Sequence, residues 1–145
     1  MFDTNVFNKI LDEDIDVECM HKGKPYFVTH IQQNEIENTK NLDRRTALLN
    51  TFHGINKTQV PTESAFYDIS VWDGANWSAE DGVIKEIIQR LNAKNKSKKN
   101  NGQDALIAET ALKNRYTLVT NDGDLREVMQ DMGGIAMSVQ ELLSS

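Results

Sequence analysis

Short apolar runs alternate along the chain with longer segments in which apolar residues recur every three or four positions. The short runs predict strands, and the longer spacing predicts helices that bury one face. Strands are expected at residues 1–4, 25–28, 65–71, 116–120 and 135–137. Helices are expected at residues 5–11, 13–20, 29–36, 42–52, 78–91, 105–112, 124–132 and from 138 onward.

Capping residues mark the start of three of these helices. The pairs Thr29–Gln32, Ser78–Asp81 and Ser138–Glu141 have the spacing in which a hydroxyl caps a helix and a polar side chain reaches back to it. Short strands that alternate with amphipathic helices predict an α/β protein with a central, mostly parallel sheet. A chain of 145 residues fits one such domain, residues 1–145.

The composition narrows the class of protein. Hydrophobic residues make up 39% of the chain and charged residues 26%, which is a globular balance. The longest apolar run, Ala105–Ala108, is too short for a membrane span or a signal-peptide core. Cys19 is the one cysteine, which excludes a disulfide and a cysteine-based zinc site within the chain. These features predict a cytoplasmic protein.

The charge is distributed unevenly. The net charge is −6, yet residues 85–99 carry six cations against one acid, so the rest of the chain sums to −11. One basic strip on an acidic body is compatible with a ligand that carries phosphate. The Asn- and Lys-rich stretch at residues 92–102 is expected to be a frayed helix end followed by a solvated loop.

Carboxylates are the strongest candidates for chemistry. The chain contains no phosphate-binding loop, dinucleotide fingerprint or nucleophile elbow, and its histidines lack the spacing of metal ligands. Asp3 follows the first expected strand, and Asp122 and Asp124 follow the strand at 116–120. The carboxyl ends of parallel strands meet at one edge of a sheet, where ligands bind. Acids gathered at that edge predict a site for Mg²⁺ or Mn²⁺.

Four motifs occur in an order that resembles the PIN-domain family, whose members include VapC-like toxin ribonucleases. They are the opening triplet Asp3-Thr4-Asn5, a helical Glu35, the run Gln-Asp-Ala-Leu-Ile-Ala at 103–108, and the run Thr-Asn-Asp-Gly-Asp-Leu at 120–125. The segment from Asp104 to Leu125 is the most specific, because it joins an acid, an Ala-rich helix, a strand and Thr-x-Asp. The resemblance implies a three-layer α/β/α fold with a central sheet.

The resemblance also implies a metal-dependent endoribonuclease. Four acids would be catalytic, and a water activated by Mg²⁺ or Mn²⁺ would hydrolyse the RNA, leaving a 5′-phosphate and a 3′-hydroxyl. Asp124 is expected as a further metal ligand, and Thr120 is expected to hydrogen-bond a carboxylate. The implied catalytic residues are Asp3, Glu35, Asp104 and Asp122, of which Asp3, Asp104 and Asp122 bind the metal together with Asp124.

The expected partner is RNA, either single-stranded or structured. Lys98 and Lys99 lie just ahead of Asp104 and are expected to guide a phosphate backbone toward the metal. The family also implies a homodimer and, for a toxin, a cognate antitoxin.

Two other functions are open. One is a catalytically silent PIN module that binds a partner protein, and the other is a Toprim- or phosphatase-like enzyme that uses Asp122 and Asp124. A phosphatase of the haloacid-dehalogenase type would need an Asp where Asn5 stands. Trp72 and Trp77 could stack on unpaired bases or pack in the core, and the role of residues 53–77 stays open.

Overall fold

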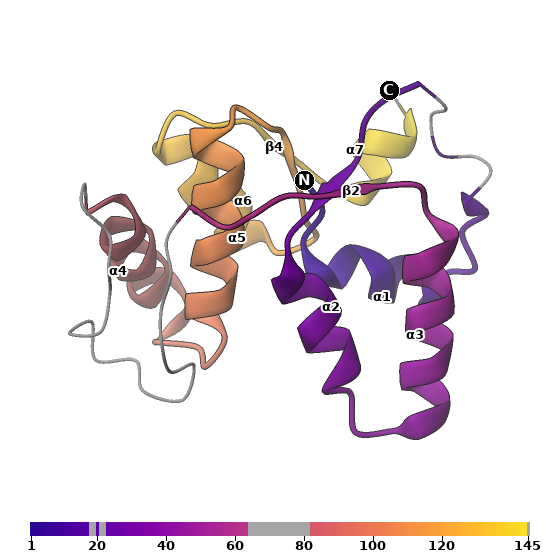
Figure 1. The fold of residues 1–145 in the computed structure, drawn as a ribbon. Helices are drawn as coiled ribbons and strands as arrows, with labels where there is room; N and C mark the ends of the chain where they lie inside the picture. Colours follow the sequence, from indigo (N-terminus) through magenta and orange to yellow (C-terminus); the bar gives the residue numbers. More distant parts are fainter. Residues whose placement is uncertain (18–19, 21–22, 64–81, 145) are drawn as a thin grey trace.

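The computed structural model describes residues 1–17, 20, 23–63 and 82–144, which form helices joined to very short strands (Figure 1). The strands are β1 (Phe27–Val28), β2 (Thr58–Gln59), β3 (Leu118–Val119) and β4 (Ala136–Met137). The helices are α1 (Thr4–Asp12), α2 (His30–Glu37), α3 (Leu42–Gly54), α4 (Val83–Asn95), α5 (Asn101–Lys113), α6 (Gly123–Asp131) and α7 (Val139–Ser144).

The described strands form two parallel pairs, β1 with β2 and β3 with β4. The N-terminal segment lies between the pairs and is hydrogen-bonded to both. The Phe2 N–H donates to the Phe27 carbonyl at 2.9 Å, and Phe2 forms a parallel bridge with Val119. The Asp3 N–H donates to the Val119 carbonyl at 3.0 Å. A ribbon of backbone hydrogen bonds therefore runs from β2 through the N-terminal segment to β4.

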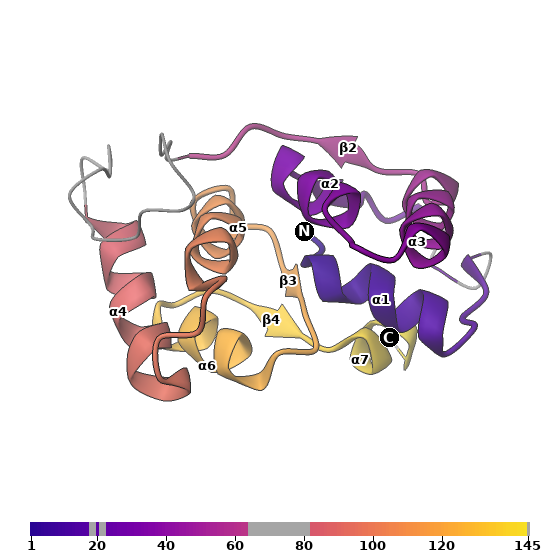
Figure 2. The ribbon, with the colours of Figure 1, turned by 90° about the horizontal axis from the view of Figure 1, so that it is seen from below.

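Apolar side chains on the two faces of this ribbon enter two different hydrophobic clusters. Met1 and Leu118 belong to a cluster with α4, α5 and α6, whereas their neighbours Phe2 and Val119 belong to a cluster with α1, α3 and α7. Figure 2 shows α4, α5 and α6 on one side of the N-terminus and α1, α2 and α3 on the other. The alternation follows from strand geometry, in which successive side chains point to opposite faces.

The expected sheet is corrected in extent. The pattern predicts strands of three to seven residues, but each strand among the described residues has two. The segment 1–4 contributes only the Phe2 bridge, because Asp3 already caps α1. Polar, exposed β2 was not predicted, because its two residues, Thr58 and Gln59, form no apolar run. The expected strand at 65–71, the residues Trp72 and Trp77 and the Ser78–Asp81 cap lie outside the described residues.

One predicted helix is not found among the described residues, and another begins earlier than predicted. A helix at 13–20 is absent from the described part of that segment, because α1 ends at Asp12 and the chain turns at Asp14, whose φ is +50°. A run of acids is unfavourable beyond the C-terminal end of a helix, where the helix dipole is negative. Helix α5 begins at Asn101 instead of 105, which places Asp104 inside its first turn. Cys19 and His21 lie outside the described residues.

Local capping signals are confirmed. The Thr29 hydroxyl accepts a hydrogen bond from the Ile31 N–H at 3.1 Å, and the Gln32 carboxamide oxygen accepts one from the Thr29 N–H at 2.8 Å. The Ser138 hydroxyl accepts from the Glu141 N–H at 3.1 Å at the start of α7. In the part of the chain that the structure describes, no helix has the length and apolar character needed to cross a membrane.

Candidate functional site

Two of the candidate acids are helix caps at the carboxyl edge of the ribbon. Asp3 follows Phe2 and caps α1, and its Oδ1 accepts a hydrogen bond from the Thr4 N–H at 2.7 Å. Asp122 caps α6, and its Oδ1 accepts from the N–H groups of Asp124 and Leu125 at 3.0 and 3.3 Å. Asp is a favoured cap because its side chain satisfies free N–H groups at a helix start. Both carboxylates are thus positioned by backbone geometry.

Thr120 joins these two acids. Its side chain is completely buried, and its hydroxyl donates to Asp3 Oδ2 at 2.7 Å. The same oxygen accepts hydrogen bonds from the Asp122 N–H and from the Asn5 carboxamide, both at 3.1 Å. The side chain after β3 therefore holds the N-terminal segment and the start of α6 in one arrangement.

Glu35 reaches the same edge from α2. Gln32, one turn earlier on this helix, is fully buried and donates its Nε2 to the Phe2 carbonyl at 2.6 Å, directly before Asp3. Glu35 Oε1 is buried and has no hydrogen-bond partner among the described residues. Burial, reinforced by the charge of Asp3, raises the pKa of Glu35 to about 7, against opposing effects of the Thr4 hydroxyl and Lys98.

Asp104 is a strongly perturbed acid of the site. It lies in the first turn of α5 and is 6% exposed. Burial raises its pKa to about 9, and the charges of Asp3, Glu35 and Asp122 act in the same direction. Burial is also the largest cause of the raised pKa of Asp3, with Asp122 contributing. Acids from four separate segments therefore converge closely enough to oppose one another's ionisation.

Asp124 has different neighbours. Glu127 accepts a hydrogen bond from Lys94 and raises the pKa of that lysine most, while Asp131 and Asp124 add to the same shift. The charges that raise the pKa values of Asp3, Glu35 and Asp104 come from one another and from Asp122. The structure thus places Asp124 beside Asp122 along the chain, with its charge acting on Lys94.

The two candidate lysines differ in their relation to the acids. Both Lys98 and Lys99 are exposed. The positive charge of Lys98 lowers the pKa values of Asp3, Glu35 and Asp104, as the smallest of the named causes in each case. Lys98 is therefore near enough for its charge to act on the acidic cluster, defined as Asp3, Glu35, Asp104 and Asp122.

The chemistry of the acidic cluster fits a hard divalent cation. Its donors are all oxygens, and the unpaired, buried Glu35 Oε1 is an open ligand position. In the described ranges, no three His, Cys, Asp or Glu side chains are placed so that together they could hold a metal ion. The carboxylates of the acidic cluster therefore do not yet surround a common point. Binding would require carboxylates to lose protons and turn toward the ion.

Several residues that support the site were not assigned a role from the sequence. Asn5 Oδ1 accepts from the Asn121 N–H at 3.2 Å, and Asn121 Oδ1 accepts from the Val139 N–H at 3.3 Å. Arg126 Nη1 donates to the Thr120 carbonyl at 2.8 Å. Asn5 belongs to the opening triplet, but a contact across more than 100 residues leaves no local pattern from which to infer a partner.

Comparison with known proteins adds no family. A search of family models finds none that matches the chain, and a search of curated proteins finds no match. The resemblance to PIN domains therefore depends on the quoted motifs and on the geometry of the acidic cluster.

Proposed function

We propose that the chain is a metal-dependent endoribonuclease of the PIN type. The observation that carries the proposal is the convergence of Asp3, Glu35, Asp104 and Asp122, the four acids of the PIN-like motifs, at one edge of the ribbon. Burying several carboxylates together lowers the stability of the fold unless some of them are protonated or a metal ion neutralises their charge. Strongly perturbed acids of this kind are typical of functional sites.

The fold supports the same proposal at a coarser level. The parallel pairing on both sides of the N-terminal segment, and the two clusters on opposite faces, are what a reduced three-layer α/β/α arrangement would produce. In such an arrangement ligands bind at the carboxyl edge of the strands, which is where Asp3 and Thr120 lie.

Each acid has a role in the proposed reaction. Glu35, with a pKa near 7, can accept a proton from an attacking water at neutral pH. Asp3 and Asp122 are held by helix N–H groups, and Asp104 completes the ligand set, with Asp124 as a further ligand. Bound Mg²⁺ or Mn²⁺ supplies an acidified water and neutralises charge on the phosphate. The proposed products are a 5′-phosphate and a 3′-hydroxyl.

The proposed substrate is RNA, and a homodimer and a cognate antitoxin are the partners that a toxin of this type would have.

The proposal is tested by incubating the purified protein with single-stranded RNA in Mn²⁺, in Mg²⁺ and in EDTA. We expect cleavage with either metal and none in EDTA. Asp104→Asn protein, purified in the same way, controls for contaminating nucleases.

Undiminished cleavage in EDTA with a cyclic phosphate product would contradict the metal mechanism, because an attack by the ribose 2′-hydroxyl needs no activated water. A folded protein that cuts no RNA under any of these conditions would favour the silent binding module instead.

The two lysines provide a second test. Replacing Lys98 and Lys99 together by Ala is expected to weaken RNA binding and to reduce the slope of log affinity against log salt by up to about two, one for each lost phosphate contact. The rate at saturating RNA should be retained. The matched control is the pair Lys24→Ala and Lys40→Ala, which removes the same charge from exposed lysines outside the basic strip at 85–99. Equal slopes for both pairs would show that Lys98 and Lys99 do not contact the phosphates.

A further inference from the structure

The Asn-rich stretch between α4 and α5 is an ordered corner. Asn101 is 3% exposed, and its Nδ2 donates to Asn92 Oδ1 at 2.7 Å and to Asn95 Oδ1 at 2.8 Å. In return, Asn95 Nδ2 donates to Asn101 Oδ1 at 2.8 Å. Both Nδ2 protons of Asn101 are thereby used. The expectation of a solvated loop holds for the exposed residues 96–99, but the expected frayed helix end is wrong, because Asn92, Asn95 and Asn101 bond to one another.

The backbone of this corner adopts an unusual conformation. Lys96 and Ser97 have φ values of +58° and +61°, a region that residues with a Cβ seldom occupy. Side-chain and backbone hydrogen bonds hold it, since Asn95 Oδ1 accepts from the Lys98 N–H at 3.3 Å and the Lys98 carbonyl accepts from the Asn101 N–H at 3.1 Å. Consecutive residues in this region persist only where the surrounding structure determines them.

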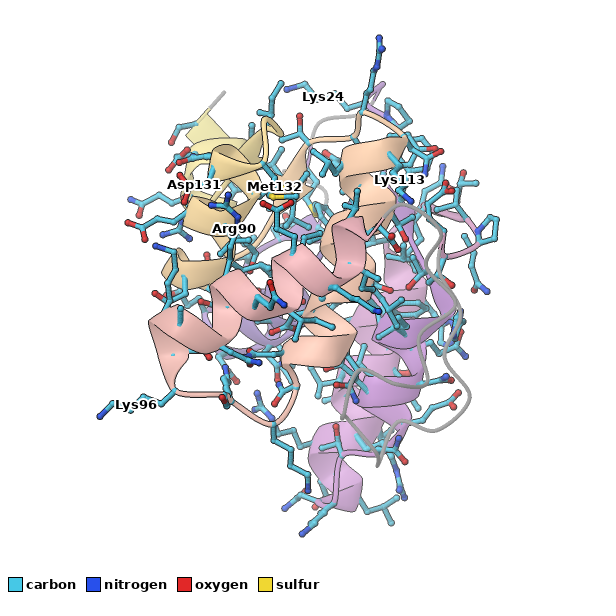
Figure 3. All side chains as sticks on the ribbon, turned by 90° about the vertical axis from the view of Figure 1, so that its left-hand side faces the viewer. Lys24, Arg90, Lys96, Lys113, Asp131 and Met132 are labelled. Carbon is cyan, nitrogen blue, oxygen red and sulfur yellow. The ribbon has the colours of Figure 1, made fainter. Side chains whose placement is uncertain are left out.

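The corner sets the direction of its lysines. Lys96 lies at the end of α4 and projects away from the body of the protein (Figure 3). Lys98 comes after the two left-handed residues and three positions before α5, whose first turn carries Asp104, and its charge acts on Asp3 and Asp104. The corner is also joined to the helix that carries Asp104, because the Asp104 N–H donates to the Asn100 carbonyl at 3.0 Å.

We propose that Asn101, together with Asn92 and Asn95, is a positioning residue that fixes Lys98 beside the acidic cluster to bind a backbone phosphate of single-stranded RNA. The inference rests on the proposed ribonuclease function. A lysine on a mobile loop loses conformational freedom when it binds a phosphate, whereas a lysine on a preorganised corner loses less. Asn101 therefore acts on substrate binding and its salt dependence, through Lys98, and not on the chemical step.

The test compares Asn101→Ala with Asn114→Ala. Asn114 lies at the other end of α5 and also donates two hydrogen bonds, to Glu63 Oε1 at 2.9 Å and to the Thr110 carbonyl at 2.8 Å. For Asn101→Ala we expect KM for single-stranded RNA to rise about tenfold with kcat little changed, and the salt slope to fall by about one. Asn114→Ala is expected to change neither. Asn95→Ala, which removes the contact to the Lys98 N–H, is the second variant should Asn101→Ala fail to fold.

A double-mutant cycle shows whether Asn101 acts through Lys98. If it does, Asn101→Ala adds little to the KM of a Lys98→Ala protein, so the two effects are far from additive. A merely structural role of Asn101 would give additive effects and leave the salt slope unchanged, and either result overturns the inference.

Failure of the inference and failure of the proposed function are distinguishable. A wild-type protein that cleaves RNA in Mn²⁺ beside an Asn101→Ala protein with unchanged KM and salt slope overturns the inference alone. Absence of cleavage by the wild-type protein overturns the proposed function. The same variants are then compared by fluorescence anisotropy of a labelled single-stranded RNA in EDTA, where equal affinities and equal salt slopes overturn the positioning role as well.

Discussion

Replacing Asp104 by Asn is expected to stabilise the metal-free protein while abolishing its ribonuclease activity. The carboxamide keeps the shape of the side chain and, unlike Asp104 with its pKa raised to about 9, does not have to bind a proton at pH 7 in order to fold. We expect the free energy of unfolding at pH 7 to rise by about 2 kcal/mol, because each pKa unit corresponds to about 1.4 kcal/mol and the cluster shares its protons. In thermal melts this is about 6 °C for a chain of this size.

Activity and metal binding should change in the opposite sense. Loss of a group that only supports a metal ligand lowers activity by up to about 100-fold. Asp104 is itself a proposed ligand, so we expect the cleavage rate of Asp104→Asn to fall by more than that. Mn²⁺ at about 100 times its dissociation constant should stabilise the wild-type protein by about 2.7 kcal/mol, and the variant far less. Thermal melts with and without Mn²⁺ measure the stabilisation by the metal, and an RNA cleavage assay on the same protein measures the activity.

The pH dependence of stability provides an independent check. The pKa of Asp104 is raised from 3.8 to about 9 in the folded protein, so the folded state keeps a proton that the unfolded state has released between these values. Stability of the metal-free wild-type protein should therefore be fully present below about pH 4 and fall as the pH rises toward 9. Asp104→Asn should reduce this decline. Melts across this range in EDTA measure it.

Asp43→Asn is the matched control for these measurements. Asp43 also lies in the first turn of a helix, α3, but it is exposed. It should leave cleavage and Mn²⁺ stabilisation unchanged and lower stability slightly, by the loss of a favourable interaction with the helix dipole. If Asp104→Asn behaves like Asp43→Asn in melting and in activity, the acidic cluster is not a functional site.

Replacing Thr120 by Val is expected to impair the site by removing the hydroxyl that holds Asp3 and Asp122 in place. The variant has nearly the same shape, but Asp3 Oδ2 loses its donor and the Asp122 N–H loses its acceptor. The unsatisfied buried groups should lower the free energy of unfolding by about 1–3 kcal/mol. The Thr120 hydrogen bond lowers the pKa of Asp3, so its loss raises that pKa further and weakens metal binding. We expect cleavage to fall about 10- to 100-fold.

Thr110→Val separates this effect from a loss of stability. Thr110 is also completely buried, and its hydroxyl donates to the Leu106 carbonyl at 2.8 Å within α5. The control should lose stability without losing activity, when cleavage is assayed well below both melting temperatures. Similar activity for the two variants, with similar Mn²⁺ titrations, would contradict a role of Thr120 at the site.

Local signals in the sequence were sufficient to predict several helices. The Thr29–Gln32 capping box and the Ser138 cap involve residues that are two or three positions apart, so their chemistry is readable without a fold. Helix α3, expected at residues 42–52, spans Leu42–Gly54. The extent of the strands was not predictable in this way, because strand pairing depends on partners that are distant in the chain.

The corner between α4 and α5 shows how a compositional rule fails. Asn and Lys are frequent in solvated loops, and the stretch 92–102 therefore predicts a loop. The three asparagines instead bond to one another across the ends of two helices, which draws Asn101 into the interior and extends α5 toward Lys98. Composition carries no information on whether polar side chains bond to water or to one another.

The sequence by itself determined the order of the acids, the approximate starts of the helices that follow Asp3 and Asp122, and the alternation of strands and helices that brings strand ends to one edge. Only the tertiary structure decided that Glu35 and Asp104 are buried beside Asp3, that Thr120 bonds to Asp3 across 117 positions, and that Asp124 acts on Lys94. The physical reason is range. Caps and periodicity act within one or two turns, whereas burial and the repulsion among carboxylates depend on which distant segments pack together.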